Sequence, residues 1–292
     1  RTLPLLALST LCLASLATSA LAQTAIKGDK ISEGFSQSRL ARIAPNVKAL
    51  GDNGTTPGAV TLVARNGKVV HFEAHGFLDA AKTKPMKKDS IFRLASMTKP
   101  IVTTAAMMLV EQGKMKLNDP IVQWLPELKD LKVETAAGDV PLNRPIWVQD
   151  IMRHTAGFVY GGAAKSPRIK KMYEDLNIES REVDITAEDM LKNLGTIPLA
   201  NQPGVNWEYS IAVDVLGLLL ERVEKKPLDV IVKTLLTDPL GMKDTGWWVE
   251  PSQQPRMAEA YDSDKLKADM LKGYRQNSNP AGKSYFKIGR AS

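Results

Sequence analysis

The 292-residue sequence has one cysteine, three histidines and few aromatic residues, and these scarcities exclude several classes of protein. A single cysteine, Cys12, cannot build a disulfide scaffold or a cysteine-based zinc or iron–sulfur cluster. His71 and His75 fall in one expected strand, about 13 Å apart at 3.3 Å per residue, which is too far for one shared metal ion. The sequence also contains no glycine-rich phosphate loop or dinucleotide fingerprint. We therefore expect no metal ion and no organic cofactor.

Positive charge is in excess but is not concentrated. The chain has 39 Lys and Arg residues against 32 Asp and Glu, a formal net charge of +7. The basic residues form small groups, at 82–88 and 165–171, without aromatic residues among them, whereas nucleic-acid-binding surfaces are denser in charge. We expect no nucleic-acid partner. With 43% hydrophobic residues the chain can bury a core, which excludes a disordered protein.

The first residues are typical of an export signal. Arg1 precedes an apolar run from Leu3 to Ala17, and Ala20-Leu21-Ala22 provides a small-residue cleavage site. No later stretch reaches the ~18 apolar residues that a membrane-spanning helix needs. We expect residues 1–22 to be a signal peptide cleaved after Ala22, and residues 23–292 to form one periplasmic or secreted domain without a membrane anchor. The oligomeric state is left open.

Between the ends, a hairpin precedes a helical block. Two strand-like runs, 58–65 and 68–76, flank Asn66-Gly67, a strong signal for a two-residue hairpin turn. Residues 97–112 are nearly uncharged, which predicts a helix buried on every side. The block extends over about 96–250, and the layout favours the α+β class. Other helical patterns occur at 35–50, 146–154, 168–178, 187–194, 208–224 and 227–237.

Ser96-Met97-Thr98-Lys99 places a hydroxyl and an amine three residues apart at the expected start of the helix over 97–112. At this spacing both side chains project from one helix face, with Cβ atoms about 5–6 Å apart. A lysine whose pKa is lowered by burial can take the proton of a serine nucleophile. The same pattern recurs at Ser284 and Lys287, within a tail rich in Gly, Pro and Lys, where we interpret it as a chance match.

A second candidate is Tyr209, which follows a Pro-Gly turn and lies at the start of the helix expected over 208–224. A protonated lysine nearby lowers the pKa of a phenol, which can then act as a base for Ser96. Without such neighbours, a tyrosine at this place is an ordinary surface or core aromatic residue. Trp207 and Ile211, on either side of Tyr209, are candidates for contact with a substrate.

Three ordered motifs carry a resemblance to a known family. They are Ser-x-x-Lys opening a helix, His154-Thr155-Ala156-Gly157, and Pro-Gly-x-x-Trp-x-Tyr-Ser, which begins at Pro203. Together they resemble the serine β-lactamase and penicillin-binding protein superfamily, in particular the class C β-lactamase-like branch that includes the family VIII carboxylesterases. The likeness runs from about Phe35 to Trp248.

The resemblance implies a β-lactamase/transpeptidase-like fold, in which helices flank an antiparallel sheet and a mainly helical subdomain lies beside it. It also implies that Ser96 is the acylated nucleophile, Lys99 its partner and Tyr209 the general base. His154 begins a family motif that is interpreted as structural, ending one helix and shaping a turn.

The sequence departs from the family pattern in two places. Penicillin-recognising members carry Tyr-x-Asn, but here the third position is Ile211, which has no hydrogen-bonding group for a substrate amide. The family also has a downstream strand motif of Lys, His or Trp, then a small residue and Gly, which supplies an oxyanion donor. Lys287-Ile288-Gly289 does not fit that motif. We therefore expect the C-terminal strands of the sheet to be missing from this chain.

These features predict an exported serine hydrolase that cleaves carboxylic esters through an acyl-enzyme, with a small-molecule ester or β-lactam-like substrate. Two other functions are also compatible with the sequence. One is a β-lactamase or D,D-peptidase, and the other is a truncated, non-catalytic remnant.

Overall fold

The computed structural model describes residues 30–179 and 185–259, and the chain divides into two compact units, Arg1–Lys88 and Asp89–Ser292. The expected signal peptide and the second Ser-x-x-Lys pattern lie outside the described residues. In the following the two are called the hairpin unit and the helical unit. No helix among the described residues is long and apolar enough to cross a bilayer.

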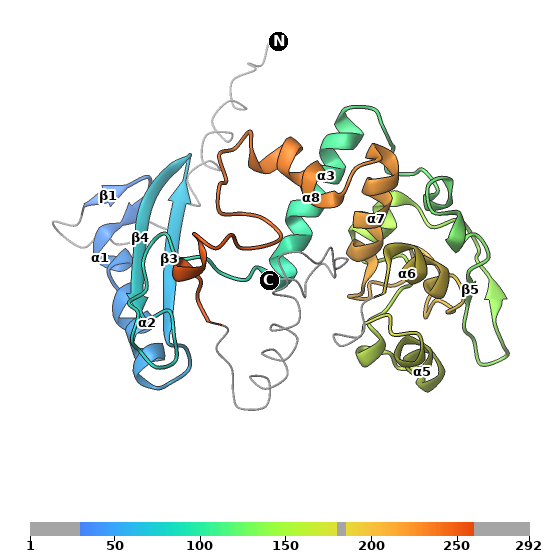
Figure 1. Ribbon diagram of the computed structural model, residues 1–292, viewed down its shortest axis with the longest axis horizontal. Coiled ribbons are helices and arrows are strands. Elements are labelled where there is room, and N and C mark those ends of the chain that lie inside the picture. The colour runs from blue at the N-terminus through green and yellow to red at the C-terminus, as the bar shows by residue number, and fades with distance from the viewer. Residues whose placement is uncertain (1–29, 180–184, 260–292) are drawn as a thin grey trace, which may run out of the picture. The chain divides into compact units, whose positions relative to one another are not determined.

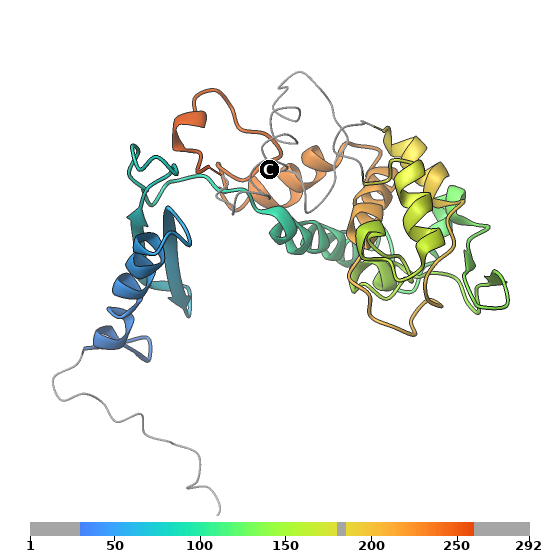
Figure 2. The same cartoon turned by 90° about the horizontal axis from the view of Figure 1, so that it is seen from below.

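The hairpin unit is built around two paired strands. Strand β3 runs antiparallel to β4 from the pair Gly58–Gly76 to the pair Arg65–Lys68, and a register shift follows Val63. This confirms the predicted hairpin over 58–65 and 68–76. Helix α2 packs against both strands (Figure 2). The elements of this unit are β1 (Ile31–Ser32), β2 (Phe35–Ser36), α1 (Gln37–Leu40), α2 (Ile43–Asp52), β3 (Gly58–Arg65) and β4 (Lys68–Gly76).

The turn between β3 and β4 explains why the hairpin forms where it does. Asn66 and Gly67 have φ values of 53° and 72°, so both adopt the left-handed conformation that a two-residue turn requires. Asparagine and glycine tolerate this conformation better than other residues. The two residues therefore set the register of the whole pair of strands.

The helical unit consists of helices joined by long irregular segments (Figure 1). Its elements are a 3₁₀ turn (Ala95–Met97), α3 (Thr98–Glu111), β5 (Lys132–Val133), β6 (Val140–Pro141), α4 (Val148–Met152), α5 (Pro167–Asp175), α6 (Ala187–Leu194), α7 (Ala212–Glu224) and α8 (Leu228–Val232), which continues as a π-helical turn (Lys233–Thr237). All helices predicted beyond residue 96 are present, several of them shorter than predicted.

Helix α7 is the centre of this unit. Every residue from Ala212 to Leu220 is buried, and α3, α4 and α8 all pack against the helix. Burying a leucine side chain stabilises the fold by about 1.5–3 kcal/mol relative to leaving it exposed. Since Leu216, Leu219 and Leu220 are completely buried, α7 contributes strongly to the stability of the core.

Helix α3 is less enclosed than predicted. Val102, Ala105 and Leu109 are buried on the face that meets α7 and α8, but Met107 is 43% exposed and Thr104 is also exposed. The prediction of burial on every side is therefore wrong for the described part of the chain, because its neighbours there cover one face only. Each sheet in the described ranges has two strands. The expectation that the C-terminal strands of the family sheet are missing stays a prediction, because residues 260–292 lie outside the described ranges.

Candidate active site

Ser96 lies in the 3₁₀ turn that leads into α3, and Lys99 lies in the first turn of that helix. The Lys99 Nζ donates a hydrogen bond to the Ser96 Oγ over 3.3 Å. Ser96 is exposed to solvent, whereas Lys99 is only 6% exposed. The N-terminus of a helix carries partial positive charge and unpaired N–H groups, so negative charge developing at Ser96 is stabilised there.

Tyr209 reaches the same serine from a distant part of the chain. Its hydroxyl forms a hydrogen bond of 2.7 Å with the Ser96 Oγ. The Lys99 Nζ lies 4.7 Å from the centre of the Tyr209 ring and 5.7 Å from that of Tyr160. The structure thus brings together the three residues that the sequence analysis selected as a catalytic set.

The surroundings of Tyr209 favour its ionised form. Partial burial raises the pKa of the phenol, but the hydrogen bonds to Lys99 and Ser96 and the positive charge of Lys99 together outweigh this effect. The pKa of Tyr209 is therefore below its ordinary value. A phenol of lowered pKa that contacts a serine hydroxyl can act as a general base.

The segment that carries Tyr209 is attached to residues 154–157 by backbone hydrogen bonds. Three N–H groups of the segment, those of Ala200, Gly204 and Glu208, donate to three carbonyl groups of residues 154–157 over 2.7–2.9 Å. The Gly157 backbone has φ of 92°, and a Cβ atom there would lie 2.1 Å from the Asn201 carbonyl oxygen. Only glycine allows this close approach, which explains the Gly157 of the motif.

A buried carboxylate anchors the other end of residues 154–157. Asp150 is fully buried and forms an ion pair with Arg144 at 2.6 Å. It also accepts hydrogen bonds from the Trp147 N–H and the Thr155 hydroxyl. Burial raises the pKa of Asp150, but these partners outweigh burial and hold it below the usual value. The carboxylate is therefore ionised at neutral pH and fixes the start of the turn.

His154 lies within this arrangement, between the anchor and Tyr209. It is 9% exposed and has φ of 60°. Burial and the charge of Lys99 lower the pKa of the imidazole to about 4, so the ring is neutral at pH 7. The expectation that this residue follows a helix and shapes a turn agrees with its place two residues after α4.

The two candidate substrate-contact residues lie in different surroundings. Trp207 is 66% exposed, and its ring stacks 6.2 Å from that of Tyr209. Ile211 is 3% exposed and belongs to the hydrophobic core at the start of α7. Its burial does not support direct contact with a substrate. Sequence reasoning missed Tyr160, whose ring lies 5.5 Å from that of Tyr209, because no local pattern marks it.

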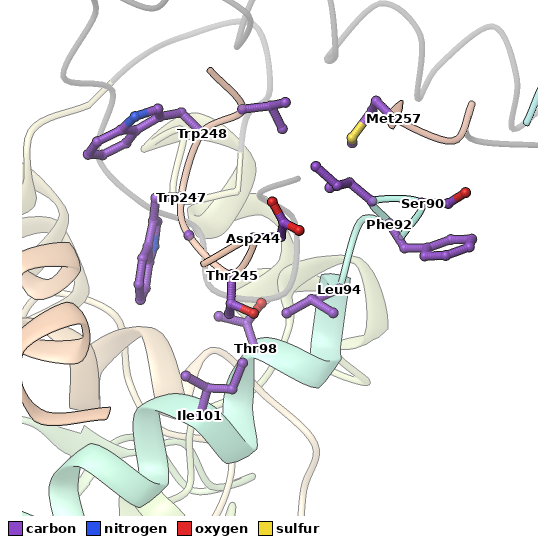
Figure 3. A pocket seen from close by; sticks show the side chains of 13 residues that line it. Ser90, Phe92, Leu94, Thr98, Ile101, Asp244, Thr245, Trp247, Trp248 and Met257 are labelled. Carbon is purple, nitrogen blue, oxygen red and sulfur yellow. The ribbon is translucent and has the colours of Figure 1, made fainter. Parts of the chain in front are cut away.

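A separate apolar pocket of about 250 Å³ lies beside the start of α3 (Figure 3). Thr98 and Ile101 line it from the helix, and Trp247 and Trp248 line it from a later segment. At 100° per residue, Thr98 and Ile101 project from the side of α3 opposite to the Ser96–Lys99 side. The pocket is therefore distinct from the catalytic set.

Among the described residues, no group of three or more His, Cys, Asp or Glu side chains is placed to hold a metal ion.

Comparison with known proteins identifies the group to which these motifs belong. The family model described as Beta-lactamase matches residues 43–283. Protein Rv1367c of Mycobacterium tuberculosis is 37% identical over 77% of this chain and 57% of its own length. Esterase EstB of Burkholderia gladioli is 38% identical over 65% of this chain and 47% of its own. The chain thus spans about half the length of the curated relatives it matches.

A solved structure supports the fold. EstCE1, described as a hydrolase with promiscuous acyltransferase activity, superposes with a TM-score of 0.67 and 32% identity over 78% of this chain and 58% of its own. This agrees with the β-lactamase/transpeptidase-like fold expected from the motifs. Since the family model covers most of the sequence and a solved structure of 32% identity covers 78% of it, the chain belongs to the beta-lactamase family.

Proposed function

We propose that this chain is a serine hydrolase that cleaves carboxylic esters through an acyl-enzyme on Ser96. One observation carries the proposal: the Ser96 Oγ lies 2.7 Å from the Tyr209 hydroxyl and 3.3 Å from the Lys99 Nζ. A serine needs such partners because its hydroxyl is a weak nucleophile until a base removes the proton.

The first half of the reaction forms the acyl-enzyme. The Ser96 Oγ bonds to the ester carbonyl carbon, and its proton passes to the pair formed by Tyr209 and Lys99. The carbonyl oxygen becomes an oxyanion, which the N-terminal end of α3 stabilises. When the C–O bond to the alcohol breaks, the alcohol oxygen takes the proton back from the pair.

The second half releases the acid. Water attacks the acyl carbon and gives its proton to the same pair, and the proton then returns to the Ser96 Oγ as the ester bond to the enzyme breaks. The products are a carboxylic acid and an alcohol. Each step uses side chains of this chain and the N–H groups at the start of α3.

Two observations favour an ester over a β-lactam as substrate. The residue two positions after Tyr209 is Ile211, which offers no hydrogen bond to a substrate amide. Esters depend less on such recognition because an alkoxide leaves more readily than an amine. The similarity to esterase EstB, 38% identical, supports the same choice. We further propose export to the periplasm or medium, supported by the signal-like residues 1–22.

The test is covalent labelling of the 292-residue chain by p-nitrophenyl butyrate and by a fluorophosphonate, followed by intact-mass and peptide mass spectrometry. We expect one acyl group on Ser96 and no labelling of Ser96→Ala. Tyr209→Phe is expected to slow acylation by about 10²–10⁴-fold, the usual contribution of a general base. Ser284→Ala is the matched control, because it removes the serine of the second Ser-x-x-Lys pattern, and it is expected to label like wild type.

Three outcomes would overturn the proposal. If Ser96→Ala were labelled as fast as wild type, Ser96 would not be the nucleophile. If a β-lactam acylated Ser96 faster than any ester, the chain would be a β-lactamase or D,D-peptidase instead. If the folded wild type, checked by circular dichroism, took up neither probe, the chain would be a non-catalytic remnant.

A further inference from the structure

His154 is bonded to the residues on both sides of Tyr209. The Glu208 N–H donates to the His154 carbonyl oxygen over 2.9 Å, and the Ser210 N–H donates to the His154 Nδ1 over 3.2 Å. The residues on either side of Tyr209 are therefore both hydrogen-bonded, through their backbone N–H groups, to one residue. A tyrosine held in this way has little freedom to move its Cα atom.

The His154 ring also restricts the Tyr209 side chain. The two ring centres lie 4.7 Å apart at an interplanar angle of 50°, and Trp207 contacts His154 edge-on at 6.2 Å. A tilted pair at this distance is a favourable aromatic contact. The ring thus supports the phenol on one side, while the phenol hydroxyl contacts Ser96.

The hydrogen bond from Ser210 identifies the tautomer of His154. The Ser210 hydroxyl lies 3.3 Å from the same Nδ1 and can donate or accept, but a backbone N–H can only donate. The bond from the Ser210 N–H therefore requires the Nδ1 to be the unprotonated, accepting nitrogen. In the neutral imidazole the proton is then on the Nε2. A protonated ring would have a hydrogen on the Nδ1 and would lose this bond to the Ser210 N–H.

His154 is unsuited to be the base itself. With a pKa of about 4, its imidazole is a weak base at neutral pH. The hydrogen bonds of the Ser96 Oγ go instead to Tyr209 and Lys99. Any contribution of His154 to catalysis must therefore act through the position of Tyr209.

We propose that His154 is the positioning residue of Tyr209, holding the phenol against Ser96 and Lys99 by bonds to the backbone N–H groups of Glu208 and Ser210 and by ring contact. This deepens the proposed function and rests on it for the catalytic meaning of the contact. The contact itself is a property of the fold and can be tested without turnover.

Losing the contacts with His154 should change the pKa of Tyr209, because that pKa depends on the charges around the phenol. Lys99 on α3 favours the phenolate, Asp214 on α7 opposes it, and the imidazole of His154 is uncharged at neutral pH. If the phenol moved away from Lys99, it would lose its main stabilising charge. The pKa of Tyr209 would then rise toward that of an ordinary tyrosine.

The test compares His154→Ala with His154→Asn. Asparagine tolerates a positive φ and offers an oxygen close to the place of the Nδ1, whereas alanine offers no acceptor. The primary measurement is the pKa of Tyr209 from the ¹³Cζ resonance of tyrosine-labelled chain, assigned with Tyr209→Phe. We expect the pKa to rise in His154→Ala and to stay near the wild-type value in His154→Asn.

The rate of Ser96 acylation is a second measurement. We expect a loss of about 10–100-fold in His154→Ala, the size of effect that a misplacement of about 1 Å produces, and substantial rescue in His154→Asn. The acidic limb of the rate profile should move to higher pH in His154→Ala only. A purely structural role would lower the amplitude of labelling in both variants and leave the limb in place.

The outcomes separate this inference from the proposed function. If Ser96 took no label but the Tyr209 pKa rose in His154→Ala, the function would fail and the positioning role would stand. If the pKa were the same in wild type and both variants, the positioning role would be wrong. If His154→Ala does not fold, the inference is tested instead by the ¹⁵N spectrum of the wild-type imidazole, which shows which ring nitrogen of His154 carries the proton. A proton on the Nδ1 at pH 7 would overturn the inference.

Discussion

The hairpin unit and the helical unit differ in what holds them together. In the hairpin unit the buried apolar side chains are few, and the best covered of them, Leu78, is still 5% exposed. Its strands leave Leu62 and Val69 more than half exposed. In the helical unit, by contrast, many apolar side chains are completely buried, and α7 is enclosed over nine consecutive residues.

The difference shows that local backbone conformation and side-chain packing contribute unequally to the stability of the two units. The hairpin is specified by a two-residue turn and by strand pairing, which need few distant contacts. The helical unit depends on apolar surface contributed by helices far apart in sequence. The candidate active site lies wholly in the helical unit, where rigid packing can hold side chains in place.

A matched pair of leucine substitutions gives the largest contrast. Leu219→Ala in α7 removes a side chain that is 0% exposed and should lower the free energy of unfolding by about 2–5 kcal/mol. Leu62→Ala in β3 removes one that is 55% exposed and should cost less than about 0.5 kcal/mol, as usual for a surface position.

Urea unfolding followed by two signals checks this pair. All five tryptophans lie in the helical unit, so tryptophan fluorescence reports on that unit, whereas circular dichroism reports on both. Leu219→Ala should shift the fluorescence transition strongly. Equal shifts for the two variants would show that the units do not differ in packing.

Acid should weaken the helical unit through His154. Its pKa is about 4 in the folded chain and near 6.5 when unfolded, so the unfolded state binds more protons between these values and stability falls as the pH drops through this window. From pH 7 to pH 5 the loss should be about 2 kcal/mol.

The measurement is the urea midpoint of tryptophan fluorescence at the two pH values, in wild type and in His154→Asn. The variant lacks the titrating ring, so its midpoint should change less than that of wild type. An equal change in both would assign the acid sensitivity to other groups.

The smallest expected effect comes from glycine substitutions, for which the two units should respond alike. Gly67 in the hairpin turn and Gly113 after α3 have φ of 72° and 70°, and a Cβ atom at either would contact nothing within 4 Å. Alanine at each should cost about 1–2 kcal/mol through backbone strain alone. Thermal unfolding of the two variants checks this. A much larger loss at one position would show that packing contributes there too.

The accuracy of sequence-based prediction follows the same division. The hairpin agreed with prediction at every residue because Asn66-Gly67 is a local signal. Helix α6 also agreed, since Thr186 caps it and apolar residues repeat along it. The helix expected from residue 208 begins instead at Ala212, because bonds to His154 keep Glu208 and Ser210 out of the helix.

The candidate site shows what sequence can and cannot provide. Ser96 and Lys99 are neighbours on one helix, so their spacing predicts their contact. The contact of Tyr209 with Ser96 joins residues 113 positions apart, and only the resemblance to a family predicted it. The bonds of His154 and the ring of Tyr160 arise from tertiary packing, which leaves no periodic trace in the sequence.

The backbone bonds between residues 154–157 and the Tyr209 segment have a consequence for how the protein can evolve. Because Ala200 and Glu208 contribute N–H groups rather than side chains, their bonds survive most changes of residue. Gly204 differs, since its φ is 83° and a Cβ atom there would lie 2.2 Å from the Arg144 guanidinium. Exposed side chains of the segment that carries Tyr209, such as that of Val205, are thus free to diversify. Selection can therefore vary substrate preference through these side chains while the backbone bonds that hold Tyr209 in place stay unchanged.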